Sequence, residues 1–165
     1  MTDSEKTSES FEEVLRLNNL ISARFAPDNN LQKTLGVSDK VMEGYYASAA
    51  QLLEQQRYDA ASDAFLFLAT LDPFNVEYWL NMGLAEHRRG NEREALKALG
   101  MACIVDPESP TPHVYAAECY MKEEDLVHAV DSLRLALEAG LDKEEYAEMK
   151  SRVFNLTRIV KHLSM

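Results

Sequence analysis

WLNMGLAEHRRGNEREALKALGMACIVDP, residues 79–107, is the stretch that decides the fold, because its pattern occurs three times in the chain. Its defining residues are Trp79, Gly83, Ala95, Leu99, Ala102 and Pro107. Similar residues stand 34 positions earlier, at Tyr45, Ala49, Ala61, Phe65, Leu68 and Pro73. The third copy lies 34 positions later and has His113, Ala117, Ala129, Leu133, Ala136 and Leu141. A period of this length indicates a repeat architecture, with copies over 42–75, 76–109 and 110–143.

Each copy has the pattern of a helical hairpin. The small eighth residue and the alanine at the twentieth position stand where two antiparallel helices touch, because a larger side chain would hold the backbones apart. The bulky residue at the twenty-fourth position fills the space between hairpins. Proline ends the second helix in the first two copies. The third copy departs from the pattern, since His113 replaces the aromatic residue and Gly140 takes the place of the proline as a helix stop.

This pattern resembles the tetratricopeptide repeat, in which aromatic, glycine, alanine and proline residues recur at fixed offsets. The resemblance predicts an all-α fold: a tetratricopeptide-repeat superhelix of three helical hairpins with an N-terminal helix and a C-terminal capping helix. Three unrelated hairpins would leave the identical spacing of Ala61, Ala95 and Ala129 unexplained.

Two flanking segments complete the predicted organisation. Residues 1–39 comprise a disordered start, a helix over residues 11–25 and a linker; residues 40–143 are the repeats, and residues 144–165 form the C-terminal helix. Repeat arrays need caps on their end faces, so the N-terminal helix either caps the first repeat or forms a self-association surface. The C-terminal helix has apolar residues at spacings of three and four, which favours packing on the third repeat over a coiled coil of the same spacing.

The composition argues against several classes of protein. The 165 residues include 17 basic and 28 acidic ones, a net charge of −11, and no basic stripe that would suit nucleic acid. No apolar run approaches the ~20 residues of a membrane span, and the first ten residues lack the features of a secretory signal. Cys103 and Cys119 are too few for a disulfide framework or a zinc site, which indicates a reducing cytoplasm. We expect no nucleic acid, no membrane insertion, no metal and no cofactor.

Catalytic motifs are missing from the sequence. It has no glycine-rich phosphate loop and no Gly-x-Ser-x-Gly elbow, and its histidines at 87, 113, 128 and 162 lack the spacing of metal ligands. His113 takes the aromatic core position of its repeat, which favours a structural role. The sequence therefore predicts that the protein is not an enzyme.

Stacked hairpins leave a concave face that is lined by the first helix of each repeat. We expect the second, fifth, ninth and twelfth positions of that helix to point into the groove, with Tyr46, Leu80, Leu84 and Val114 facing solvent in the free protein. The candidate binding residues are Tyr46, Ala50, Leu53, Leu80, Leu84, His87, Val114, Glu118 and Met121. An apolar strip on an acidic protein favours a binding site. The alternative is that N-terminal residues or a second subunit fill it.

One known groove chemistry can be tested directly. Tetratricopeptide co-chaperones that grip a C-terminal carboxylate use lysine, asparagine and further basic residues at five groove positions. This chain has Tyr46, Ala50, Asn81, Thr111 and Tyr115 there, so only the asparagine matches and no cation is present. The residues argue against a carboxylate clamp.

Several short motifs resemble those of the class II chaperones of bacterial type III secretion systems. They are Val41-Met42-Glu43-Gly44-Tyr45-Tyr46, Tyr58-Asp59-Ala60-Ala61, Leu71-Asp72-Pro73 and Ala116-Ala117-Glu118-Cys119. The family's groove aromatics fall on Tyr46, Ala50 and Leu53, of which only the first is aromatic here, and the usual glycine of the first hairpin turn is Gln56.

The resemblance implies a non-catalytic chaperone in the bacterial cytoplasm. Its concave groove would hold an extended segment, containing proline and leucine, of hydrophobic translocator proteins and keep them soluble and unassembled before export. Such chaperones often form homodimers through N-terminal helices, which here would be the helix over residues 11–25. The alternative is a tetratricopeptide scaffold or adaptor that joins folded partner proteins.

Overall fold

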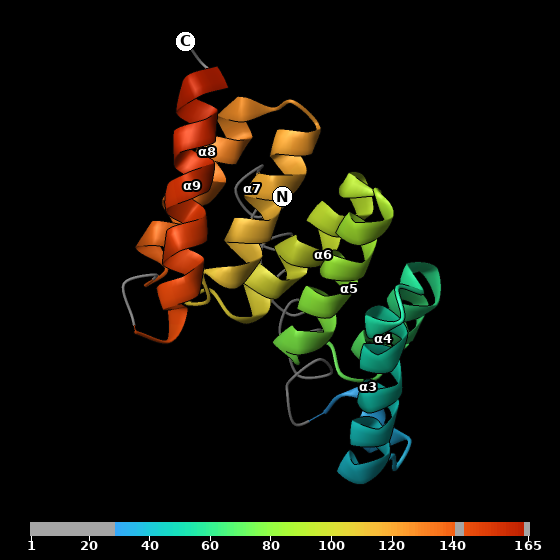
Figure 1. Cartoon of the computed structure of the whole chain (residues 1–165). Helices are drawn as coiled ribbons and strands as arrows, with labels where there is room; N and C mark the ends of the chain where they lie inside the picture. Colours follow the sequence, from blue (N-terminus) through green and yellow to red (C-terminus); the bar gives the residue numbers. More distant parts are fainter. Residues whose placement is uncertain (1–28, 141–143, 164–165) are drawn as a thin grey trace, which may run out of the picture.

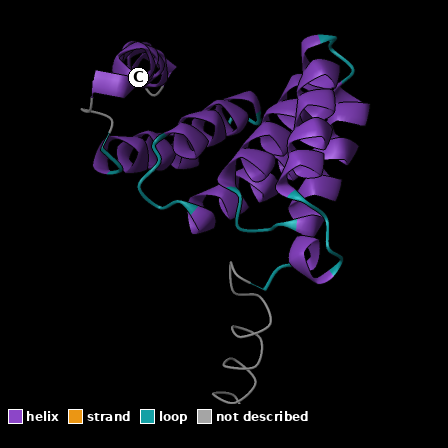
Figure 2. Cartoon of the chain, turned by 90° about the horizontal axis from the view of Figure 1, so that it is seen from below, coloured by secondary structure: helices purple, strands orange, loops and turns teal. Residues whose placement is uncertain are grey.

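The computed structural model describes residues 29–140 and 144–163. Within these ranges the regular elements are all helices, and Figure 2 shows only helices and connecting loops there. They are α2 (Leu31–Thr34), α3 (Asp39–Glu54), α4 (Tyr58–Leu71), α5 (Val76–Arg89), α6 (Glu92–Val105), α7 (Thr111–Lys122), α8 (Leu126–Glu138), a 3-10 turn (Glu144–Tyr146) and α9 (Ala147–Leu163). The predicted all-α class is confirmed. The helix predicted over residues 11–25 lies outside the described residues.

The helices form three hairpins that stack side by side. The first hairpin is α3 with α4, the second is α5 with α6, and the third is α7 with α8 (Figure 1). Side-chain caps begin several of these helices: Ser38 accepts a hydrogen bond from the Val41 N–H, and Asn75 accepts one from the Glu77 N–H. Within the described residues no helix combines the length and the apolarity that a membrane crossing requires.

Small residues set the close approach of the two helices in each hairpin, as the repeat spacing predicts. Ala49, Ala61 and Ala95 are fully buried. At Gly83 a Cβ atom would lie 2.8 Å from Cγ of Leu99, so any side chain there would displace the leucine. The interior is close-packed at these positions, and a larger residue would strain it.

Each hairpin turn contains one residue in the left-handed backbone region. The angle φ is 84° at Gly90 in the second turn, and 60° at both Gln56 in the first turn and Glu124 in the third. Glycine adopts this conformation freely, whereas a residue with a Cβ atom loses roughly 1–2 kcal/mol. The first and third turns are therefore strained, and the replacement of the family's usual glycine by Gln56 has an energetic cost.

The C-terminal helix α9 packs on the third hairpin and makes contacts with both α7 and α8 (Figure 1). Val153 and Val160 of α9 are buried in one cluster with Val114 and Leu133. This packing is the capping role that the apolar spacing of the segment predicts.

Candidate binding groove

Two pockets lie between α3 and α5, the first helices of the first two repeats. We call the surface that contains both pockets the α3–α5 seam. The amino-end pocket has a volume of about 450 Å³. Four carboxylates and two tyrosines dominate its lining, which consists of Gln32, Asp39, Met42, Glu43, Tyr46, Asp72, Asn75, Glu77 and Tyr78. An acidic pocket with aromatic walls suits a cationic or amide-bearing group that also presents apolar atoms.

The carboxyl-end pocket lies at the other end of the same seam. It has a volume of about 280 Å³ and is lined by Leu53, Glu54, Gln56, Tyr58, Leu84 and Arg88. Leu53 and Leu84 are half-buried and come from α3 and α5 respectively. Leu53 and Leu84 supply apolar surface to this pocket, and its other four residues carry polar or charged groups, so it suits an aliphatic side chain with polar backbone groups beside it.

Tyr46 connects the seam to the hydrophobic core. Its ring meets the buried Phe65 ring edge-on, with 5.9 Å between centroids, and lies 6.0 Å from the Tyr78 ring. Its hydroxyl accepts a hydrogen bond of 3.3 Å from the Asn81 side-chain amide. Tyr46 is therefore a half-buried wall of the amino-end pocket and not a free surface residue.

The structure places the other predicted groove residues at different depths. Ala50, Leu80 and Met121 are half-buried, like Tyr46, Leu53 and Leu84. Two residues are buried: Val114 has no exposed surface, and His87 is 7% exposed. The expectation that Val114 faces solvent is wrong. The fifth position of a repeat faces the first helix of the next repeat. In the third repeat the helix in that place is α9, which packs on Val114 and buries it.

Helix α9 covers the groove face of the third repeat. The Thr111 hydroxyl lies 3.7 Å from Sδ of Met149, and Val114 packs in the cluster that contains Val153. Arg152 of α9 makes two hydrogen bonds of 2.6 Å to the carboxylate of Glu118. The candidate residues on α3 and α5, apart from the buried His87, therefore form an open set, whereas Val114 and Glu118 of α7 form a covered set.

A polar network lies at the junction of the second and third repeats. Nδ1 of His87 is 2.6 Å from Oε2 of Glu92, and the Lys122 ammonium donates a 2.9 Å hydrogen bond to the other oxygen of that carboxylate. On the far side of the imidazole ring, Nε2 lies 3.6 Å from Oε2 of Glu118. The Arg152 guanidinium that pairs with Glu118 also stacks over the Tyr115 ring at 4.7 Å.

The charged groups of this network stabilise the ionised forms of their neighbours. The Glu118 carboxylate raises the pKa of His87, and Glu92 acts in the same direction, against the effect of burial. Burial raises the pKa of Glu118, but hydrogen bonds from His87 and Arg152 outweigh it and keep that pKa below its usual range. His87 thus serves as a bridge between repeats instead of lining the groove.

Sequence reasoning missed three members of this network: Glu92, Lys122 and Arg152. Arg152 lies in the flanking helix, where no repeat offset applies. One signal was available, because a carboxylate such as Glu118 on an otherwise apolar face requires a cationic or hydrogen-bonding partner when it is buried. The amino-end pocket also uses Tyr78, Asp39 and Asp72, which occupy no groove position of the repeat pattern.

The stack of three helical hairpins is a tetratricopeptide-repeat-like fold, and comparisons with known proteins show which proteins resemble the chain. No protein-family model matches the chain. The low calcium response locus protein H of Yersinia pestis is 27% identical over 125 residues, which is 76% of this chain and 74% of the relative.

Solved structures of related chaperones have the same fold. The Yersinia enterocolitica type III secretion chaperone SycD, in complex with a peptide of the translocator YopD, matches with a TM-score of 0.74 at 25% identity. The match covers 78% of this chain and 98% of SycD. PcrH, a Pseudomonas aeruginosa protein solved with the chaperone-binding region of PopD, matches with a TM-score of 0.75 at 22% identity over 79% of this chain and 98% of PcrH. The resemblance to type III secretion translocator chaperones is confirmed.

Proposed function

We propose that this chain is a non-catalytic chaperone of the bacterial cytoplasm. It binds an extended segment, containing proline and leucine, of type III secretion translocator proteins and keeps them soluble and unassembled before export. The observation that carries the proposal is the match in fold to SycD, a chaperone solved with a translocator peptide, and the sequence match to low calcium response locus protein H supports it. The α3–α5 seam supplies a surface on which such a segment would lie.

The seam is suited to an extended chain because its two pockets lie at opposite ends of α3 and α5. An aliphatic side chain of the client would fill the carboxyl-end pocket between Leu53 and Leu84. A second side chain would enter the amino-end pocket beside Tyr46. Proline in the client favours this mode of binding, because its fixed backbone angle lowers the entropy lost on binding.

Co-expression with the translocator genes of the same organism tests the proposal. A translocator that is insoluble alone should become soluble when the chaperone is present, and the two proteins should co-purify. A partner that is already soluble alone and gains nothing from co-expression would instead indicate a scaffold that joins folded proteins. The Leu53→Ala, Leu84→Ala double variant is the matched control, and it should lose the solubilising effect while it remains folded.

Self-association belongs to the same proposal. We expect a homodimer that forms through the helix predicted over residues 11–25. Light scattering on the full chain and on a variant that lacks residues 1–28 checks this expectation. The full chain should have the mass of a dimer and the shortened variant that of a monomer; a dimer in both would place the interface within the repeats.

A further inference from the structure

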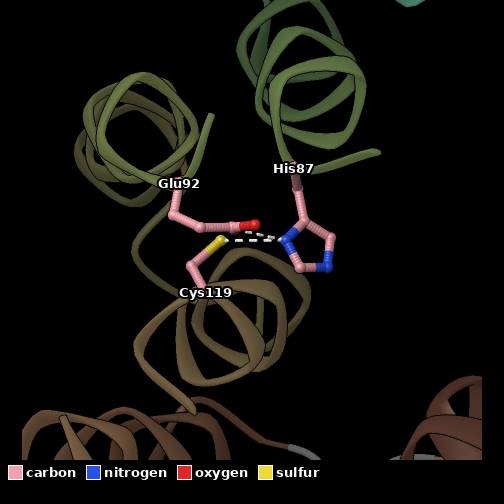
Figure 3. A group of neighbouring side chains, drawn as sticks. All are labelled: His87, Glu92 and Cys119. Carbon is pink, nitrogen blue, oxygen red and sulfur yellow. Dashed lines mark hydrogen bonds and ion pairs between the residues drawn. The ribbon is translucent and has the colours of Figure 1, made fainter. Parts of the chain in front are cut away.

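Three potential metal ligands converge at the junction of the second and third repeats. His87 lies in the last turn of α5, Glu92 is the first residue of α6, and Cys119 lies on α7 (Figure 3). One ring nitrogen of His87, Nδ1, faces both other side chains, at 2.6 Å from Oε2 of Glu92 and 3.4 Å from Sγ of Cys119. The three donor atoms lie within 4.8 Å of one another, and all three residues are buried. We infer that His87, Glu92 and Cys119 form a binding site for Zn²⁺.

The donor set and the spacing fit this ion. Zn²⁺ takes nitrogen, oxygen and sulfur ligands at about 2.0–2.3 Å in a tetrahedron, so its ligand atoms stand roughly 3.3–3.6 Å apart. The distance from Nδ1 to Sγ already has this value. The distance from Nδ1 to Oε2 must lengthen by roughly 0.7 Å to reach the tetrahedral spacing, which a rotation of the flexible Glu92 side chain achieves. A water molecule completes the four ligands.

The surroundings of the site also match those of protein metal centres. A metal-binding histidine usually directs its second ring nitrogen at a carboxylate, which fixes the tautomer and the orientation of the ring. Here Nε2 of His87 faces Oε2 of Glu118 at 3.6 Å, and two hydrogen bonds from Arg152 hold that carboxylate. Lys122 binds Oε1 of Glu92 and leaves Oε2 to the ion.

The charges of the bound site balance. Binding replaces the thiol proton of Cys119, which leaves to solvent, and uses the neutral form of His87. The ionised Cys119 and Glu92 then offset the two charges of the ion. The Lys122 side chain is about half exposed, so its ammonium group stays hydrated and opposes the ion only weakly. The site and its test are independent of the proposed chaperone function.

Titration of the tag-free full chain with Co²⁺, a spectroscopic substitute for Zn²⁺, tests the inference. We expect a near-ultraviolet absorption band from cobalt–thiolate charge transfer, which Zn²⁺ displaces. Cys119→Ser should abolish the band, and Glu92→Gln should weaken Zn²⁺ binding at least tenfold. The chain offers a matched control in Cys103, whose Sγ lies 3.7 Å from Nδ1 of His113 with no carboxylate in that pair. Cys103→Ser should keep the band and the Zn²⁺ affinity.

Circular dichroism of each variant shows whether it is folded, and so separates the loss of a ligand from the loss of the fold. If Cys119→Ser does not fold, Glu92→Gln still tests the site, because it removes a ligand and keeps the thiol. The inference is overturned if the wild-type protein shows no thiolate band with Co²⁺, or if the band depends on Cys103 instead of Cys119. It is equally overturned if Zn²⁺ binds the Glu92→Gln variant as tightly as the wild type, because the ion would then sit at a surface pair such as Asp125 and His128.

Discussion

The α3–α5 seam and the contact between α7 and α9 are built from the same repeat positions, yet one is open and the other is covered. Position five is Tyr46 in the first repeat, Leu80 in the second and Val114 in the third. The first two are half-buried, whereas Val114 has no exposed surface. The difference arises from the neighbouring helix, since α9 lies across α7 while α3 and α5 leave pockets between them.

The position of a side chain in the repeat therefore does not by itself decide how exposed that side chain is to solvent. The ninth position shows the same division. Leu84 of the second repeat lines an open pocket, whereas Glu118 of the third repeat is hydrogen-bonded by Arg152. A side chain at a groove position binds a partner only where the solenoid leaves that position uncovered.

Removing the apolar walls of the open seam should have the largest effect, and that effect should be on binding. Each large apolar side chain that becomes buried contributes ~1.5–3 kcal/mol, and ~1.4 kcal/mol corresponds to a factor of ten in affinity. Leu53→Ala combined with Leu84→Ala should therefore weaken binding of a translocator peptide at least tenfold in a calorimetric titration. Val114→Ala is the control, and it should lower the melting temperature while the folded protein keeps its affinity. The reverse pattern would contradict the division into open and covered parts.

Arg152→Ala should destabilise the covered end. The substitution removes two hydrogen bonds to the largely buried Glu118 carboxylate, and a hydrogen bond to a charged group contributes about 1.5–3 kcal/mol. Urea unfolding followed by circular dichroism measures the loss. Arg134→Ala, which breaks an exposed pair with Glu138 on α8, should change stability by at most about 0.5 kcal/mol. Equal losses in the two variants would mean that the Arg152 pair contributes no more than a surface pair.

Ala95→Leu should overpack the second hairpin, which lies between the two ends. Ala95 has no exposed surface, and added methylenes in a packed core cost ~1–3 kcal/mol. Gly100→Ala on the same helix is the matched control. A Cβ atom at Gly100 meets nothing within 4 Å, so that change should stabilise the helix by roughly 0.5–1 kcal/mol. Thermal unfolding of both variants measures the contrast, and a change of the same sign in both would show that Ala95 is not at the close contact.

The smallest expected effect concerns the strained turns. Gln56→Gly and Glu124→Gly should each raise the free energy of unfolding by up to about 1 kcal/mol, because glycine adopts the left-handed angle without steric cost. Gln56 also lines the carboxyl-end pocket and Glu124 does not. Only Gln56→Gly should therefore alter peptide affinity, measured by the same titration. An equal change in affinity for both variants would show that turn strain acts on binding through the whole stack.

Much of the fold could be predicted because the repeat pattern depends on local packing. The spacing of Ala49, Ala61 and Gly83 reflects close helix contacts that the structure shows directly. The same offsets put Tyr46, Leu53 and Leu84 on one side of α3 and α5, where the structure has two pockets. Nothing in the repeat itself indicates that α9 covers Val114, because that contact joins the third repeat to a segment outside the pattern. Likewise, His87, Glu92 and Cys119 meet only through tertiary packing, so their separation in the chain conceals the cluster.

The separation of the two seam pockets has a consequence for the length of the bound segment. On α3, Glu43 lines the amino-end pocket and Leu53 lines the carboxyl-end pocket. The helix between them rises roughly 15 Å at ~1.5 Å per residue. An extended chain covers that distance with ~5 residues at ~3.3 Å each. Client peptides shorter than about five residues therefore leave one of the two pockets empty.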